Sequence, residues 1–288
     1  MIAPYAAPQT GGQNDTPHIP GDSGGPVHYG NGEIQLAVTD LSVSGFGLDF
    51  GHTRIFSNRL NGDFDFGNGY NWLVRDLPQL IEEDDNTVLM LQGTRGAMWF
   101  DLIGGKYVGR YGTKFTLVHN DANGTFTLAT PNGQTLVFND FNVANAGLFQ
   151  SQTTAGGQVL QVTSYAPGTA LGIGEVQRSY ATGGVSIIES FLYNHAGDDL
   201  GSVLLRRKIG SGGWQNVRQV LYAYYGDNDP NGSFGDLKTA TVQTFNAGAW
   251  QTIENNYYRY WTIDGGGGLW HGLKYVVGGA AYDRMVSA

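Results

Sequence analysis

The chain has 288 residues, among them 45 glycines and 9 prolines, and only 14% of its residues are charged. Long surface helices and coiled coils depend on Glu, Lys and Arg, so this composition argues against both. The 41% hydrophobic content is enough to bury a core, which argues against a disordered chain. The net charge of −9 repels phosphate backbones, so we expect no nucleic-acid partner.

Cysteine is absent from the sequence, which excludes disulfides, thiolate chemistry and cysteine-based zinc sites. No apolar run approaches the roughly 20 residues of a membrane helix, so we expect no membrane span. The N-terminal residues lack the basic start and the apolar stretch of a signal peptide. The composition therefore leaves the compartment open.

Residues 1–30 combine five prolines with Gly, Gln, Asn and Asp and show no periodic apolar positions, which predicts a flexible linker. Within it, the string Gly21–Pro26 is identical to the segment around the nucleophile of chymotrypsin-like serine proteases. Ser23 would need a general base, an orienting carboxylate and an oxyanion hole, yet His18 is the only histidine before it. We therefore interpret the string as part of the linker.

The pattern changes to short alternating runs at residue 33. Ile34, Leu36 and Val38 share one face of a predicted half-buried strand. Farther along, the runs Thr87–Leu91 and Ala97–Leu102 are separated by a short Gly-containing segment. This spacing predicts a β-hairpin.

The clearest regularity lies between residues 113 and 139, where apolar residues recur every ten or eleven positions. Asn123-Gly124 and Asn132-Gly133 fall in the gaps. Because Asn-Gly tolerates the positive φ of a tight hairpin turn, the region predicts a three-stranded antiparallel meander. Phe126 lies in its middle strand, so we expect it to be deeply buried.

Longer strands are predicted at 185–193, 202–209 and 214–225, with Val203, Leu205 and Ile209 on one face of the second. No long helical period is visible, so we predict an all-β fold of antiparallel hairpin and meander sheets. A change of rhythm near residue 145 suggests a division of the chain. We expect three parts: a linker at 1–30, an N-terminal β domain at 31–145 and a region of degenerate β-hairpin repeats at 146–288.

Three acidic segments are candidate sites. Asp227–Gly232 has the start of a calcium loop, but its twelfth position is Lys238 rather than Glu, which favours a polar hairpin loop. Glu82–Asp85 and the pair Asp63/Asp65 could supply the two facing carboxylates of a glycoside hydrolase. Neighbours on a strand point to opposite faces, so solvated loops are the preferred interpretation.

Histidines and aromatic residues give no sharper signal. The histidines show no paired metal-ligand spacing, and we predict no metal, cofactor or catalytic residue. The tryptophans and the Tyr257–Trp261 cluster could stack sugars, although packing within a sheet is their commoner role. These residues are His18, His28, His52, His119, His195 and His271, and Trp72, Trp99, Trp214, Trp250, Trp261 and Trp270.

Five segments of the first half together resemble the N-terminal region of Rhs/YD-repeat proteins: Asn31–Glu33, Thr39–Leu41, Gly45–Leu48, Thr53–Asn58 and Phe66–Trp72. In that family this strip has a strand ending in Asp-Leu, a Gly-x-Gly turn, an Arg-x-Tyr-Asn-Ser strand and a Phe-Gly-x-Gly-Trp turn. Here Phe56 replaces the usual Tyr. The second half is similar to degenerate Tyr-rich repeats of such chains, at Val217–Tyr225, Gly235–Ala240, Tyr257–Tyr260 and His271–Tyr275.

The resemblance implies a spiralling β-shell fragment of a secreted or cell-surface bacterial protein. Its function would be structural and non-enzymatic, as a shell or a contact surface, and in some family members the shell encloses a C-terminal toxin. The implied partners are further repeats of the same chain, a C-terminal cargo domain or a cell-surface ligand. We also expect an unpaired edge strand at 273–277.

Two alternative functions remain open. A carbohydrate-binding or adhesion module would show two or three exposed coplanar rings on a concave face. A glycoside hydrolase fragment would show a cleft with two facing carboxylates.

Overall fold

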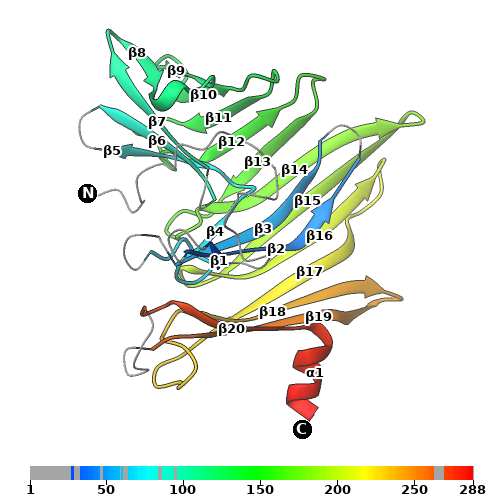
Figure 1. The fold of residues 1–288 in the computed structure, drawn as a ribbon. Helices are drawn as coiled ribbons and strands as arrows, with labels where there is room; N and C mark the ends of the chain where they lie inside the picture. The colour runs from blue at the N-terminus through cyan, green and yellow to red at the C-terminus, as the bar shows by residue number, and fades with distance from the viewer. Residues whose placement is uncertain are drawn as a thin grey trace.

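The computed structural model describes residues 27–28, 33–45, 48–58, 60, 64–83, 86–93, 96–262 and 269–287, and it confirms the all-β prediction (Figure 1). Its strands form three antiparallel sheets within the described residues. Most of the predicted linker, including Ser23, lies outside these residues. Only Val27 and His28 are described, and they pair with the strand that follows.

The N-terminal sheet has the strand order β1-β2-β3-β4, and the second sheet has the order β5-β6-β7-β8. The bounds of their strands are β1 (Val27–His28), β2 (Glu33–Val43), β3 (Phe50–Ser57), β4 (Trp72–Val74), β5 (Gln79–Glu83), β6 (Thr87–Gln92), β7 (Gly96–Ile103) and β8 (Lys106–Gly109).

The large sheet has 12 strands in chain order, and each pairs with its neighbours in the sequence. Its strands are β9 (Thr116–Asn120), β10 (Thr125–Ala129), β11 (Thr135–Asn139), β12 (Phe149–Thr153), β13 (Val159–Tyr165), β14 (Ile173–Thr182), β15 (Val185–Ala196), β16 (Asp199–Ile209), β17 (Gln215–Tyr224), β18 (Leu237–Asn246), β19 (Ala249–Tyr260) and β20 (Leu273–Gly278). A 3₁₀ turn (Arg110–Gly112) precedes this sheet and a helix, α1 (Gly279–Ser287), follows it. No helix in the described part of the chain has the length and apolar character needed to cross a membrane.

The predicted meander is confirmed as β9, β10 and β11. Phe126 on β10 lies opposite His119 on β9 and Phe138 on β11. Gly124 and Gly133 adopt positive φ angles of 60° and 82° in the two connecting turns. The Asn-Gly pairs thus act as the turn residues that the sequence indicated.

The other predicted strands are also found. The hairpin expected at 87–102 is formed by β6 and β7, and the strands expected at 185–225 are β15, β16 and β17. Val203 and Leu205 are buried, whereas Ile209 is 45% exposed. Pairing of β16 with β17 stops at Arg207, so Ile209 has no partner residue on β17.

The large sheet continues across residue 145. β11 and β12, on either side of this position, are paired through Leu136 and Gln152. The structure therefore shows no break in the sheet here, and the division into 31–145 and 146–288 stays a prediction from the sequence.

One hydrophobic core is shared by all three sheets. It includes Leu41 of β2, Val88 of β6, Phe126 of β10 and Tyr258 of β19. The N-terminal sheet lies against the large sheet near β14–β17, and β2 contacts β17 and β18 (Figure 1). Burying apolar area on both layers is the main force that holds them together.

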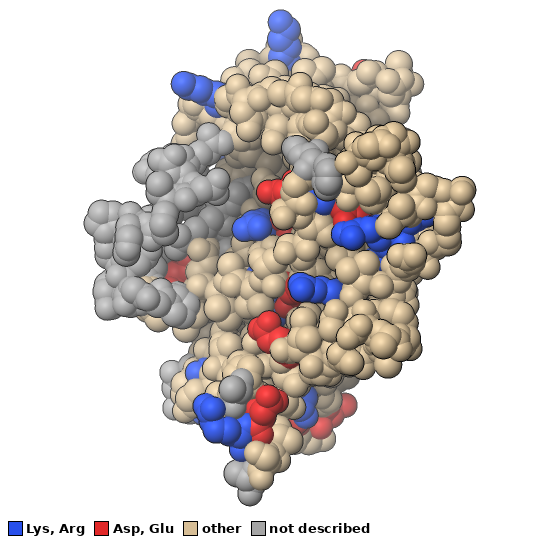
Figure 2. Space-filling model, turned by 90° about the vertical axis from the view of Figure 1, so that its right-hand side faces the viewer, with Lys and Arg blue, Asp and Glu red and all other residues tan. Residues whose placement is uncertain are grey.

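Charged side chains are interspersed on the face shown in Figure 2, where basic and acidic groups lie next to one another. The large sheet also holds ion pairs of Arg206 with Glu175 at 2.7 Å and of Arg207 with Glu189 at 2.6 Å. Their fields largely cancel at a distance, which suits a surface that is not built to attract a polyanion.

Phe126→Ala tests the packing of the meander. The Phe126 ring is 1% exposed, stacks on His119 at 4.3 Å and contacts Tyr107 and Phe141. We expect a loss of about 3–5 kcal/mol in the free energy of unfolding because the substitution leaves a cavity. Denaturant titration measures this loss. The control is Val118→Ala at a 54% exposed position of β9, and equal effects of the two substitutions would contradict the assignment.

Candidate functional site

A buried ion pair lies between the N-terminal sheet and the large sheet. Arg54 of β3 donates to both carboxylate oxygens of Asp40 on β2, at 2.5 and 2.8 Å, and neither side chain is exposed. Asp40 continues the face of Ile34, Leu36 and Val38, and the bulge between Thr39 and Leu41 then brings Leu41 and Val43 to the buried side. The alternation expected from Ile34 onward therefore does not continue past the bulge.

Aromatic residues of the large sheet surround this ion pair. The Tyr222 hydroxyl donates to Asp40 at 2.6 Å, and the Arg54 guanidinium donates to the Tyr258 hydroxyl at 3.1 Å. The guanidinium also lies 4.7 Å from the ring of Trp72. Burial opposes the charge of Arg54, but the Asp40 carboxylate beside it raises the pKa of Arg54 well above its ordinary value. Arg54 thus stays charged inside the protein.

His52 lies beside the ion pair. Its ring contacts Tyr193 and Tyr222, and neither ring nitrogen has a hydrogen-bond partner within the described residues. Burial lowers the pKa of His52 to about 4, because a second cation next to Arg54 would be desolvated. The histidine is therefore a neutral packing group at neutral pH.

A second buried arginine holds the loop between β2 and β3. Arg178 of β14 donates to Glu189 of β15 at 2.7 Å and to the carbonyl oxygens of Ser44, Gly45 and Leu48. The guanidinium thereby supplies a donor to the buried Leu48 carbonyl and also binds the carbonyls of the exposed residues Ser44 and Gly45.

The turn at residues 65–70, named here the docking turn, forms a third contact with the large sheet. The Leu200 amide donates to the Gly67 carbonyl at 2.7 Å. Gly67 and Gly69 have φ angles of 84° and 86°, and a Cβ on Gly69 would lie 2.8 Å from the Leu237 amide nitrogen. Only glycine allows this backbone approach.

Two carboxyl groups meet beneath the docking turn. Asp65, which accepts a hydrogen bond from the Gly67 amide at 2.7 Å, is hydrogen-bonded to Asp199 of β16. Burial and the neighbouring charge of Asp65 raise the pKa of Asp199 to about 7, and burial also raises the pKa of Asp65. The pair therefore holds a shared proton below that pH.

A histidine–aspartate pair borders the same turn. His271 Nδ1 lies 2.7 Å from Asp236, both side chains are buried, and the imidazole stacks on Tyr70 at 3.9 Å. This orientation is that of a base held by a carboxylate. The nearby Ser233 hydroxyl accepts a hydrogen bond from Trp270, and His271 Nε2 has no partner within the described residues.

The acidic segments that the sequence offered as candidate sites lie in different environments. Asp63, Asp84 and Asp85 lie outside the described residues, while Asp65 pairs with Asp199. The segment 227–232 belongs to the loop between β17 and β18, where Asp229 bonds the Lys238 ammonium at 3.1 Å. The basic group at the twelfth position thus takes the place that a cation would need.

His119, Asp121 and Asp140 come together although the sequence shows no metal-ligand spacing. His119 Nε2 lies 2.7 Å from Asp140, and Nδ1 lies 3.2 Å from Asp121. Burial would raise the pKa of Asp140, but hydrogen bonds from His119 and Asn142 lower it. The imidazole of His119 thus bridges the two carboxyl groups.

The tryptophans do not form one platform. Trp72 and Trp99 are buried, Trp214 stacks on Arg206 at 4.3 Å, and Trp261 lies against Lys274 at 4.2 Å. Tyr257, Tyr258 and Tyr260 are buried as well. Trp72, Trp99 and the three tyrosines therefore pack in the core, whereas Trp214 and Trp270 are 37% and 45% exposed.

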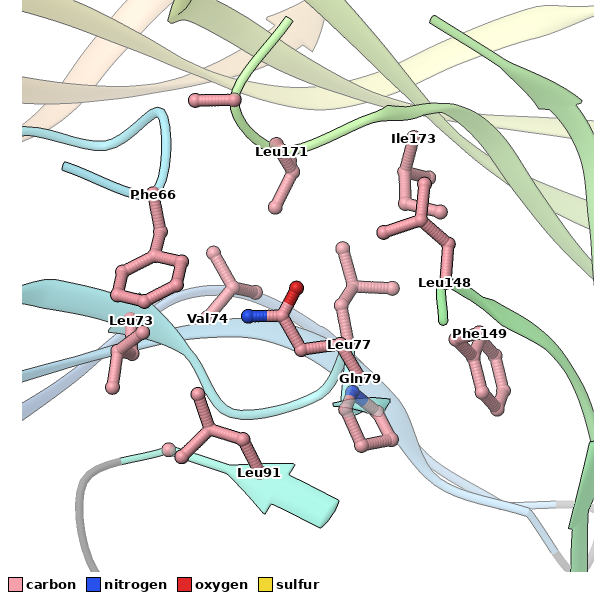
Figure 3. Close-up of a pocket in the computed structure, with 13 residues that line it drawn as sticks. Phe66, Leu73, Val74, Leu77, Gln79, Leu91, Leu148, Phe149, Leu171 and Ile173 are labelled. Atoms are coloured by element: carbon pink, nitrogen blue, oxygen red, sulfur yellow. The ribbon is translucent and has the colours of Figure 1, made fainter. Parts of the chain in front are cut away.

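A small apolar cavity lies where the docking turn, β4 and loops of the large sheet meet (Figure 3). Phe66, Leu73, Leu148 and Leu171 are among its lining residues, and its volume is about 20 Å³. A space of this size holds about one water molecule, so it is a packing gap rather than a substrate pocket.

Comparisons with known proteins do not assign the chain to a family. No protein-family model matches it. A search of curated proteins likewise gives no significant match.

Asp40→Asn tests the buried ion pair. The substitution leaves the Arg54 charge buried without its counter-ion, so we expect a loss of about 3–5 kcal/mol in the free energy of unfolding. Chemical denaturation followed by tryptophan fluorescence measures this loss. The matched control is Asp101→Asn, which breaks the partly exposed pair with Arg110 and should cost about 0–1 kcal/mol. A loss at position 40 no larger than the control would contradict the role of the pair.

Asp199→Asn tests the shared proton. Because the folded-state pKa of Asp199 is raised, the folded protein binds more protons than the unfolded chain between pH of about 4 and 7. Stability contributed by the pair is present below this window and is lost as pH rises through it. An amide donates to Asp65 at any pH, so the midpoint of the variant relative to the parent should rise between pH 5 and 8.

Thermal melts across this range give that difference, which also removes contributions common to both proteins, such as that of His52. The control is Asp283→Asn on the exposed surface of α1, which should show a constant difference. A constant difference for Asp199→Asn as well would mean that the two carboxyl groups do not share a proton.

Proposed function

We propose that this chain is a non-enzymatic structural β module of a secreted or cell-surface Rhs/YD-repeat-like protein. Its large sheet would act as the wall of a shell or as a contact surface. The partners would be further strands of the same chain, a cargo domain or a cell-surface ligand.

The main support is that the segments resembling Rhs proteins are the ones that join the two layers. Thr39–Leu41 contributes Asp40, Thr53–Asn58 contributes Arg54, and Phe66–Trp72 contributes most of the docking turn. Their contacts on the large sheet come from the Tyr-rich segments, through Tyr222 and Tyr258. Residues that characterise the resemblance thus have a common structural purpose.

The topology supports the same proposal. A sheet whose strands follow chain order can grow by adding one hairpin after another, with each strand covering the edge of the last. Such growth needs no rearrangement of the strands already in place. An extended wall is the natural product of this arrangement.

β20 is the point where growth would continue. It pairs with β19, and within the described residues no other strand pairs with it. Tyr275 and Val276 are 55% and 45% exposed, and Lys274 is the only charged residue of the strand. Such an edge offers unpaired N–H and C=O groups to another strand.

We expect the protein to self-associate through this edge as its concentration rises, as measured by sedimentation velocity. Val276→Lys should suppress association because a charge on an edge strand discourages pairing. The matched control, Leu221→Lys, adds the same charge to an exposed site of the interior strand β17 and should leave association unchanged. A monomer at every concentration would show that the edge is closed and would argue against growth at β20.

A further inference from the structure

A groove separates the second sheet from the first strands of the large sheet. Its lining includes the apolar residues Met90 of β6, Leu128 of β10 and Leu136 of β11. Its volume is about 300 Å³, which is at the lower end of the range for small-molecule sites. We name it the amide groove after the residues of its rim, Gln92, Phe115, Thr130, Asn132, Gln134 and Gln152.

The rim is polar but uncharged. Four of its side chains are carboxamides, and no Asp, Glu, Lys, Arg or His is among the described lining residues. A carboxamide donates and accepts hydrogen bonds at the same time, as a sugar hydroxyl group does. A phosphate, carboxylate or ammonium group would enter this groove without a counter-charge, which is unfavourable. The chemistry of the rim therefore favours a neutral polyhydroxyl ligand.

The amides project from a rigid support. Gln152 of β12 is paired with Leu136, which is paired in turn with Leu128, so the three side chains lie on the same face of the sheet. Thr130 fixes the turn that carries Gln134: the Gln134 amide donates to Thr130 Oγ1 at 3.0 Å, and Oγ1 donates to the Gln134 carbonyl at 3.1 Å. Groups on a fixed backbone lose little freedom when a ligand binds.

The side-chain amides of Gln134 and Gln152 have no hydrogen-bond partner among the described residues, which leaves both available. Phe115 lines the same groove and supplies an aromatic ring to it. The C–H face of a pyranose packs on such a ring, while its hydroxyl groups bond to amides. From these features we propose that the amide groove binds a neutral glycan, with one or two sugar rings between Phe115 and the two glutamines.

This site is separate from the shell proposed above, because the groove lies far along the sheet from β20 (Figure 1). It is also distinct from the tryptophan platform considered from the sequence, because no tryptophan lines it in the described residues. The proposal can therefore fail while the structural role stands, and the reverse also holds.

Binding of maltotriose, cellotriose and lactose to the full chain, followed by saturation-transfer NMR and calorimetry, tests the proposal. At least one of these neutral sugars should bind with a dissociation constant of about 10 mM or lower, a range that includes weak single-site glycan binding. The double variant Gln134→Ala/Gln152→Ala should weaken that binding at least tenfold. Gln251→Ala, which removes an exposed amide on β19, is the matched control and should not change it.

Phe115→Leu gives a second, independent readout, because it keeps an apolar side chain but removes the ring. It too should weaken binding, and a thermal melt of each variant shows whether it is folded. Failure of all three sugars to bind would overturn the proposal. Binding that is unchanged in both the glutamine and the Phe115 variants would place the sugar elsewhere and would overturn it as well.

Discussion

The ion pair between Asp40 and Arg54 fixes how the N-terminal sheet lies on the large sheet. A charge moved away from its partner inside the protein would cost several kcal/mol, so neither strand can slip without losing this contact. Tyr222 and Tyr258 extend the constraint to the large sheet, because their hydroxyl groups complete the hydrogen bonds of the pair. Apolar packing supplies most of the attraction between the layers, whereas the ion pair selects one register.

Two further contacts remove the freedom that a single point of attachment would leave. Arg178 holds the loop between β2 and β3, and the docking turn inserts between loops at the ends of large-sheet strands. Each contact matches exposed backbone groups with a donor or acceptor on the other layer. The paired carboxyl groups of Asp65 and Asp199 add a protonation-dependent element to the last of them. A sheet with open edges is thereby combined with a covering layer of defined position.

The same arrangement explains where the proposed binding site lies. The second sheet does not continue the large sheet but leans over its first strands, and the amide groove is the space between them. Packing closes this space near Phe126, where Tyr107 of β8 contacts the ring. The amide groove, lined by Thr130, is flanked by Met90, Leu128 and Leu136 of the buried core. Structural and binding roles can thus reside at opposite ends of one sheet.

The turns and individual strands could be predicted from the sequence. Asn-Gly pairs placed the turns around β10, and alternation identified Phe126 and the strands at 87–102 and 185–225, because these signals depend on neighbours within a hairpin. The candidate sites depended on tertiary structure. Asp199 is hydrogen-bonded to Asp65, and Asp236 pairs with His271. Gln152 and Met90, from distant parts of the chain, line the same groove. No local period encodes such contacts, and the bulge next to Asp40 places Leu41 and Val43 on the buried side, where alternation from Ile34 would not put them. Only the packing of one sheet on another decided which polar groups would be buried together.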